Sequence, residues 1–220
     1  MDLGRDADLL TGRHCLGRPA VAGVAAKGNR VNQPSIVTGP QAEADTRRWL
    51  ERAVIGLNLC PFAKAVHVRG QVHYAVYLSP DESGLIDALV AEARALHDVS
   101  ATARDTTLLI APNTLTDFLD FNDFLAHAER RLAREGFDGE LQLASFHPCF
   151  QFAGTEPDDI TNATNRAPYP TLHLLREESV DRAVEAFPDA EAIFGRNMET
   201  LEALGVSGWK ALDVGPGAAR

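Results

Sequence analysis

Apolar residues recur at helical spacing in the first patterned stretch of the chain, at Trp49, Leu50, Ala53, Val54 and Leu57. Asp45 and Thr46 precede most of this stretch and are residue types that can cap a helix. Pro61 disfavours helical geometry at the residue before it, Cys60. The pattern therefore predicts a helix that begins near residue 45 and stops at Cys60.

Strands and helices then alternate along the chain. Alternating or continuous apolar runs predict four strands, at Val72–Leu78, Thr106–Ala111, Leu141–Phe146 and Thr171–Arg176. Helical spacing predicts four more helices: one after Ser79-Pro80-Asp81, one between Thr114 and Glu135-Gly136, one that Ser179 caps, and one from Ile193 to Leu204 with Gly205 as its C-cap.

This alternation favours an α/β or α+β fold, in which helices pack on a single layer of about four strands. Right-handed crossovers would make the first three strands largely parallel. A split four-stranded sheet with some antiparallel pairing is the open alternative. We expect three segments: a disordered N-terminal arm at 1–40, one α/β domain at 41–213, and a frayed, Gly/Pro-rich tail at 214–220.

Composition narrows the class of protein. The 220 residues are 45% hydrophobic and 24% charged, the balance of a globular protein, and the formal net charge is −10. Such a charge repels nucleic acid and anionic membranes, and no stretch approaches the roughly 18 apolar residues that span a bilayer. The three cysteines, Cys15, Cys60 and Cys149, do not form a disulfide framework. We therefore expect a cytoplasmic protein that binds neither nucleic acid nor a membrane.

A long polar segment, 146–170, separates the third and fourth predicted strands. A loop of this length inside a compact domain is usually either functional or disordered. Its aromatic residues Phe146, Phe150, Phe152 and Tyr169 favour order, because disordered segments are poor in aromatics. Loops that follow the carboxyl ends of strands are common ligand sites in α/β sheets. The sequence therefore places any function in or near this loop.

Several strings in the chain are long enough to be specific. These are 56–62 (GLNLCPF), 106–112 (TTLLIAP), 145–148 (SFHP) and 164–177 (TNRAPYPTLHLLRE). Together they resemble a family of bacterial proteins that is catalogued only as a domain of unknown function, over about 45–209. The resemblance implies one domain and brings no established activity. It also implies that Cys149 and Ala167 stand where relatives carry other residues.

The leading functional hypothesis is a pocket that binds a small anionic molecule. Arginine suits carboxylate or phosphate, asparagine orients polar ligands, and histidine moves protons near neutral pH. His147 is the candidate acid–base residue and Cys60 the candidate nucleophile. The candidate binding residues are Asn162, Asn165, Arg166, Tyr169, His173 and Arg176. Equally open is a polar network that only pins the loop, with Arg166 bonded to backbone carbonyls.

Alternation along the strands decides whether the two histidines can meet. It places His147 on the face of Leu141 and Leu143, and His173 on the face opposite Leu172. The hypothesis needs these two faces to coincide. Cys60 lies at a predicted helix C-terminus, where the helix dipole disfavours a thiolate.

Two rival hypotheses come from other classes. Cys60, His147, Cys149 and His173 are acceptable zinc ligands, although their spacing matches no recognised motif, and Asp158, Asp159 and Asn162 could hold a hard cation. Alternatively, the loop aromatics dock a partner protein or close a homodimer. The sequence leaves the cofactor and the reaction unknown.

Overall fold

The computed structural model describes residues 37–186 and 192–217. The arm predicted at 1–40 therefore lies, apart from its last four residues, outside the described residues. The helical elements are α1 (Gly39–Trp49), η2 (Leu50–Ile55), α2 (Ala63–Val68), α3 (Glu82–His97), α4 (Phe118–Arg134), η3 (Ile160–Asn165), α5 (Glu177–Glu185) and α6 (Ile193–Ala211). The strands are β1 (Val72–Val76), β2 (Thr106–Ile110), β3 (Leu141–Phe146) and β4 (Thr171–Arg176).

The four strands form one mixed sheet in the order β1-β2-β4-β3. β1 and β2 are parallel, whereas β4 is antiparallel to both β2 and β3. The first three strands therefore run in one direction, and the fourth is inserted between the second and the third. The predicted α/β class with a partly parallel sheet is confirmed.

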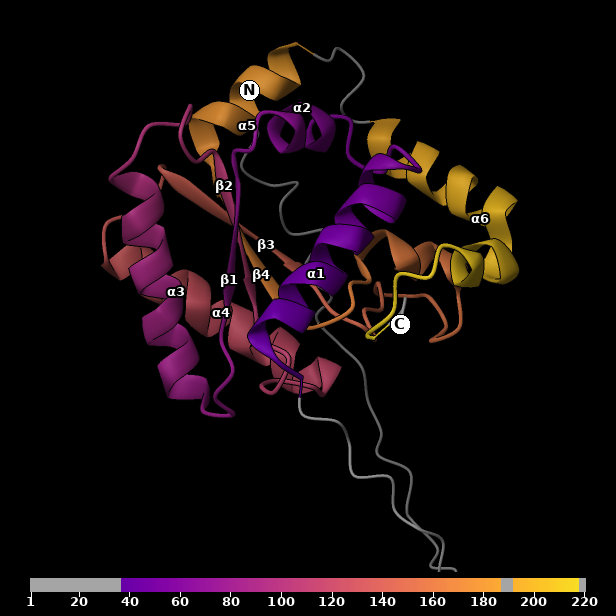
Figure 1. The fold of residues 1–220 in the computed structure, drawn as a ribbon, viewed down its shortest axis with the longest axis horizontal. Coiled ribbons are helices and arrows are strands. Elements are labelled where there is room, and N and C mark those ends of the chain that lie inside the picture. Colours follow the sequence, from indigo (N-terminus) through magenta and orange to yellow (C-terminus); the bar gives the residue numbers. More distant parts are fainter. Residues whose placement is uncertain (1–36, 187–191, 218–220) are drawn as a thin grey trace, which may run out of the picture.

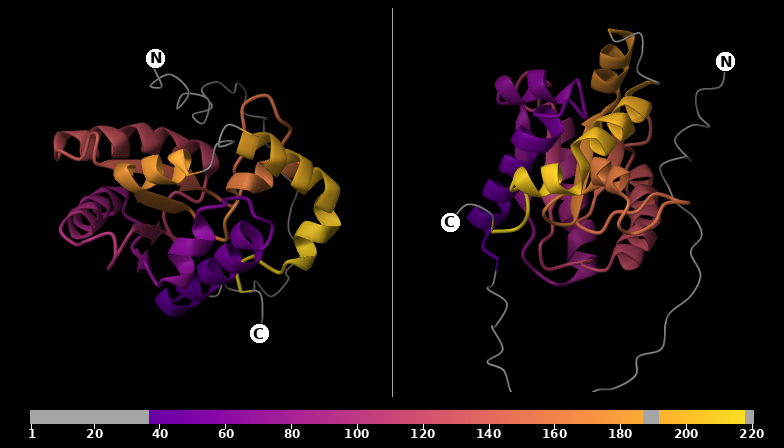
Figure 2. Two further views of the ribbon diagram at one scale, coloured as in Figure 1. Left: turned by 90° about the horizontal axis from the view of Figure 1, so that it is seen from above. Right: turned by 90° about the vertical axis from the view of Figure 1, so that its right-hand side faces the viewer.

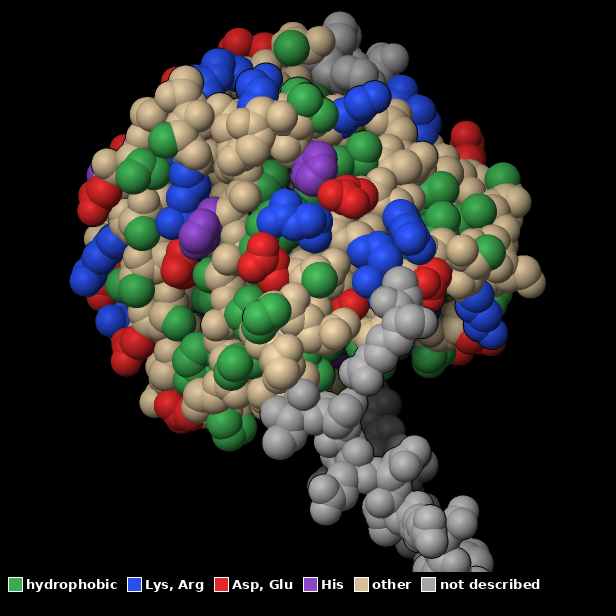
Figure 3. Space-filling view, viewed as in Figure 1, with side chains coloured by type: hydrophobic (Ala, Val, Ile, Leu, Met, Phe, Trp, Pro, Cys, Tyr) green, Lys and Arg blue, Asp and Glu red, His purple; other side chains and the backbone are tan. Residues whose placement is uncertain are grey.

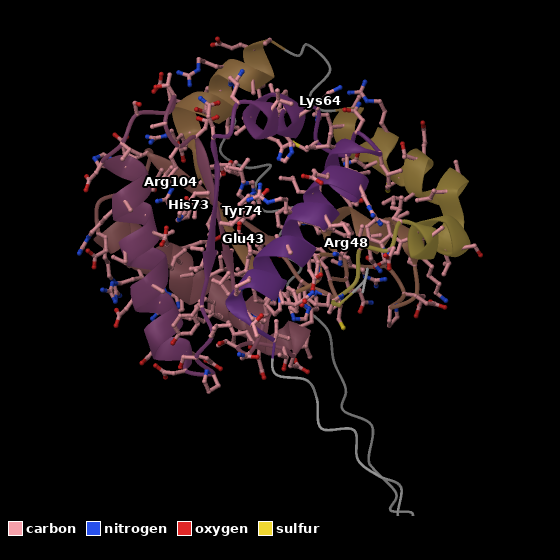
Figure 4. All side chains as sticks on the ribbon, viewed as in Figure 1. Glu43, Arg48, Lys64, His73, Tyr74 and Arg104 are labelled. Atoms are coloured by element: carbon pink, nitrogen blue, oxygen red, sulfur yellow. The ribbon has the colours of Figure 1, made fainter. Side chains whose placement is uncertain are left out.

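Helices cover both faces of this sheet (Figure 1). The view from above places α3 and α4 on one side and α1 and α6 on the other (Figure 2). The larger core cluster joins α3 and α4 to the strand residues Leu109, Leu172 and Leu174. On the opposite face, α1 and η2 contribute Trp49 and Leu50 to a second cluster. Sequence-adjacent strand residues therefore point to opposite faces of the sheet, as Figure 4 shows for His73 on the α3 side of β1 and Tyr74 on the α1 side.

The first helix begins six residues earlier than its pattern predicts. Thr38 is its N-cap and accepts a hydrogen bond from the Gln41 backbone amide at 3.3 Å. Asp45 and Thr46 are buried within the helix, so the prediction that they cap it is wrong. The Asp45 carboxylate accepts instead from the Tyr169 hydroxyl at 2.7 Å, a partner 124 residues away. The Asp45 carboxylate is therefore used in a long-range hydrogen bond and not in capping its own helix.

Two smaller corrections have the same cause. Ser179 does not cap α5, which begins at Glu177; its hydroxyl donates to the Asp105 carboxylate at 2.6 Å. Residues 214–217 do not form a frayed tail, because Val214 is buried and the Gly217 amide donates to Asp45. The prediction for Gly205 is confirmed: with φ of 65° and ψ of 173° it is non-helical and marks the kink at which the first helical stretch of α6 ends.

Candidate functional site

A pocket of about 690 Å³ lies on the α1 side of the sheet. Its floor is made of alternate residues from all four strands, which the strand register aligns in two neighbouring rows: Val72, Thr106, Leu175 and Gln142, then Leu108, His173 and Ala144. Its walls come from η2, α2 and α5. The volume is in the range of small-molecule sites.

The pocket exists because small residues face it. Ala63, Ala65, Ala144, Ala183 and Ala186 all line it, and an alanine side chain cannot reach across to the opposite wall. One wall is the π-helical turn η2, which presents Leu50 and Val54. Short π-helical turns are rare and often occur at functional sites.

His173 is the polar group at the centre of the floor. Thr106 Oγ1 lies 2.6 Å from His173 Nε2 and 2.6 Å from the Leu174 carbonyl oxygen. A threonine hydroxyl has one proton and a carbonyl only accepts, so Thr106 donates to Leu174 and His173 donates to Thr106. The neutral imidazole therefore leaves Nδ1 as an acceptor. Among the described residues, Nδ1 has no hydrogen-bond partner, and the His173 side chain is only partly buried.

Cys60 lines the same pocket, at the turn between η2 and α2. Burial raises the pKa of its thiol, and the backbone amides of Phe62 and Ala63 oppose that shift without cancelling it. Burial also lowers the pKa of His173 to about 4. At pH 7 both groups are therefore neutral, and they do not form the thiolate–imidazolium pair that a cysteine nucleophile uses.

His147 lies on the other face of the sheet. Its ring packs against Phe118 and Phe121 of α4, with ring centroids 5.4 and 5.1 Å away. The two histidines therefore do not converge, and the condition that the hypothesis needed, that their two faces coincide, is not met.

Both ring nitrogens of His147 are bonded to backbone. Nε2 donates to the Leu115 carbonyl at 3.1 Å, and Nδ1 accepts from the Cys149 amide at 3.0 Å. Leu115 has φ of 56°, a conformation that a branched residue rarely adopts, so His147 supports a strained turn. The ring is fully buried, and burial lowers its pKa. These contacts are those of a structural residue.

The polar residues of the loop bind the loop itself. Asn162 is fully buried; its Oδ1 accepts from the Phe152 amide and the Thr155 hydroxyl, and its Nδ2 donates to the Glu156 carbonyl. Arg166 donates to the carbonyls of Phe150 and Pro157. The network that pins the loop, with Arg166 on backbone carbonyls, is the arrangement found. The loop is thus ordered without presenting these groups to a ligand.

The remaining three candidate binding residues lie in different places. Asn165 donates to the Ser145 carbonyl, and the Tyr169 hydroxyl donates to Asp45. Arg176 borders the pocket, but its guanidinium donates to the carbonyls at the carboxyl end of α3 and just beyond it, at Leu96, Val99 and Arg104. Of the eight candidates, Cys60 and His173 line the pocket together with Arg176, whose guanidinium is engaged as just described.

The candidate metal ligands are not brought together in the described part of the chain either. Cys60 and His173 lie on the face opposite His147, and no group of three or more His, Cys, Asp or Glu residues within the described part of the chain is placed to hold a metal ion. Asp159 accepts from the Thr161 amide and caps η3. Asn162 is engaged as described above.

The surface around β1 and α1 mixes acidic and basic side chains without a large patch of one sign (Figure 3). No described helix combines the length and the apolar character needed to cross a membrane.

Comparison with known proteins identifies a family. The family model described as "Protein of unknown function (DUF1415)" matches residues 41–211. The chain belongs to the DUF1415 family. The matched range contains the whole sheet, the loop and all the residues named above that line the pocket. No curated protein and no solved structure shows a significant match.

Most of the residues that line this pocket were not predicted as site residues from the sequence of the DUF1415 chain. They lie far apart along the chain: Trp49 ends α1, Arg69 follows α2, Phe146 ends β3 and Arg182 is in α5. The folded arrangement places them around one pocket. One signal was available: a histidine inside an otherwise apolar strand, on the face away from Leu172 and Leu174. A polar residue at such a position borders either a polar network or a cavity.

Proposed function

We propose that the protein binds a small, largely apolar molecule in the pocket between the sheet and the helices α2 and α5. The observation that carries the proposal is a volume of about 690 Å³ with an apolar interior and one central hydrogen-bond acceptor, His173 Nδ1. Sites for small organic molecules combine a mostly apolar lining with few convergent polar groups.

The interior favours a ligand that is neutral where it meets His173. An unpaired charge is costly to bury, and the imidazole is uncharged at neutral pH because burial lowers its pKa to about 4. A hydroxyl or amide N–H of the ligand would supply the donor that Nδ1 lacks. The neutral Cys60 thiol supports binding in preference to covalent catalysis.

N-phenyl-1-naphthylamine, an uncharged dye that fluoresces in apolar surroundings, tests this function directly. We expect saturable fluorescence enhancement with the wild-type chain. Ala183 lines the pocket from α5, and Ala183→Trp should weaken dye affinity by about tenfold or more, because the indole fills the volume.

Val184, the next residue of α5, provides the matched control. Its side chain is 46% exposed and does not line the pocket, so Val184→Trp should leave dye affinity within about twofold of wild type. The absence of enhancement with the wild-type chain, or equal losses in the two tryptophan variants, would overturn the proposal.

A further inference from the structure

We infer that the ligand of this pocket is an organic acid, whose anionic group lies at the exposed rim against Arg69 and Arg182 while its apolar body enters the interior. This inference rests on the proposed function and names the chemical class of the ligand.

The charges that line the pocket have the opposite balance to the whole chain. The chain carries a formal net charge of −10, yet the described residues that line the pocket include three arginines and one acidic residue, Asp105. Two of the arginines, Arg69 and Arg182, are available at the pocket, whereas Arg176 turns its guanidinium to carbonyls at the carboxyl end of α3 and just beyond it. A cleft lined mainly by one sign of charge, with low-dielectric walls, raises the local concentration of ligands of the opposite sign.

Two of these arginines keep donors available for an anion. Arg69 is exposed at the end of α2; its Nε donates to Gln71, and among the described residues no carboxylate pairs with it. Arg182 pairs with Glu178, one turn earlier on α5, with both side chains more than half exposed. Exposed pairs of this kind contribute little, so a ligand can displace them. Arg176 is different, because its guanidinium is engaged with backbone carbonyls.

Asp105 does not cancel this balance. Its carboxylate accepts from the Ser179 hydroxyl at 2.6 Å, and Ser179 Oγ also accepts from Arg182 at 2.9 Å. The acidic group is thus held within a short chain of hydrogen bonds that ends at Arg182. Among the described residues, Arg182 pairs with Glu178 and makes no direct ion pair with Asp105.

The position of the charges fixes the orientation of the ligand. Among the described lining residues, no cation points into the interior, because His173 is neutral and Arg176 turns its guanidinium to carbonyls at the carboxyl end of α3 and just beyond it. The side chains around the interior include Trp49, Leu108 and Phe146. An anion buried there would lack a partner. The arginines come from α2 and α5, which lie at the same end of the molecule in both Figure 1 and Figure 2. The acid group therefore faces solvent at that end.

Two dyes that share one ring skeleton distinguish binding of the anionic group from binding of the apolar body. 8-Anilinonaphthalene-1-sulfonate is N-phenyl-1-naphthylamine with an added sulfonate, which is ionised at all working pH values. We expect Arg69→Gln and Arg182→Gln each to weaken binding of the sulfonate dye by about fivefold and to leave binding of the neutral dye within about twofold. Sulfonate binding should also weaken as NaCl is raised from low salt, whereas neutral-dye binding should not.

Three controls make the result specific to the pocket. Ala183→Trp should remove sulfonate binding as well, which shows that both dyes share one site. Arg130 is exposed on α4, on the other side of the sheet, so Arg130→Gln should leave both affinities unchanged. Arg69→Lys keeps the charge and should retain most sulfonate binding.

The two proposals fail in different ways. If neither dye binds the wild-type chain, the pocket is closed to ligands and both proposals are overturned. If both dyes bind and Ala183→Trp blocks them, but the arginine variants bind the sulfonate as wild type does, the proposed function stands and the acid is overturned. Selective loss of sulfonate binding in Arg69→Gln and Arg182→Gln supports both.

Discussion

The loop at 147–170 and the pocket on the opposite face contrast in how they use their polar groups. The loop is dense in threonine, asparagine and aspartate and carries one arginine, and the Asn162 and Arg166 side chains bond to its own backbone. The pocket has few polar groups, and its central one, His173, keeps a ring nitrogen without a partner among the described residues. A polar group is available to a ligand only when folding leaves it unbonded and reachable.

The largest expected effect comes from breaking the loop. Asn162→Ala removes three hydrogen bonds from a fully buried residue and leaves the Phe152 amide without its acceptor. We expect the free energy of unfolding to fall by about 2–4 kcal/mol, measured by urea denaturation. Dye binding by the folded fraction should not change, because the pocket lies elsewhere.

Asn113→Ala is the matched control for this change. Asn113 makes one exposed hydrogen bond, to the Leu78 carbonyl, so its removal should lower stability by about 0.5–1 kcal/mol. Similar losses in the two alanine variants would contradict the view that the loop is a structural clamp.

The pocket should instead affect how the free energy of unfolding depends on pH. Burial lowers the pKa of His173 to about 4, whereas the unfolded chain titrates near 6.5. Between these values the unfolded state binds more protons, so stability is present above pH 6.5 and is lost as the pH falls toward 4. We expect His173→Asn to remove about 1–3 kcal/mol of this pH dependence.

The measurement is urea denaturation of both proteins at pH 7 and pH 5. His147 contributes in the same direction, since burial lowers its pKa too, but it is present in both proteins and cancels in the difference. Identical pH dependence in wild type and His173→Asn would mean that the His173 imidazole is better solvated than its position in the floor indicates.

The sequence predicted the sheet well because strands and helices differ in periodicity. β3 at 141–146 and β4 at 171–176 have the bounds that their patterns predicted. Alternation gave the face of each histidine within its own strand, but only the register of β3 against β4, with Ala144 opposite His173, shows that the two faces are opposite. What it could not give was the partner of each polar group: Asp45 and Ser179 looked like local caps, but they bond to Tyr169 and Asp105, which lie far along the chain.

The candidate site was predicted less well for a related reason. Residue types that suit ligands were most concentrated in the loop, yet the same chemistry satisfies buried backbone groups. The pocket arises from small side chains and from the strand order, and neither has a local signature. Cys60 and His173 were chosen for their chemistry, and the fold places both at the pocket.

Tyr169 tests how firmly the end of the loop is attached to α1. Burial raises the pKa of Asp45, but hydrogen bonds from Gln41, Gly217, Tyr169 and Arg48 outweigh it, so the net pKa of this carboxyl is lowered. Tyr169→Phe removes one of these bonds and should cost about 1–2 kcal/mol in the free energy of unfolding.

Tyr77→Phe serves as the comparison in the same thermal or urea measurement. Its hydroxyl donates to the Asp81 carbonyl in an exposed position, so the loss should stay below about 1 kcal/mol. An equal effect at the two tyrosines would show that the Asp45 contact adds nothing beyond an ordinary surface hydrogen bond.

The two described thiols give the finest comparison, because one belongs to each region. Cys149 is exposed in the loop, whereas Cys60 is partly buried in the pocket and burial raises its thiol pKa. In a Cys15→Ser background, we expect Ellman's reagent to modify Cys149 about tenfold faster than Cys60. Adding Cys60→Ser or Cys149→Ser assigns the two rates.

Saturating N-phenyl-1-naphthylamine should slow only the Cys60 reaction, because the dye occupies the space through which the reagent reaches the sulfur. Equal rates at the two thiols would contradict the burial of Cys60, and protection of Cys149 by the dye would place the dye at the loop.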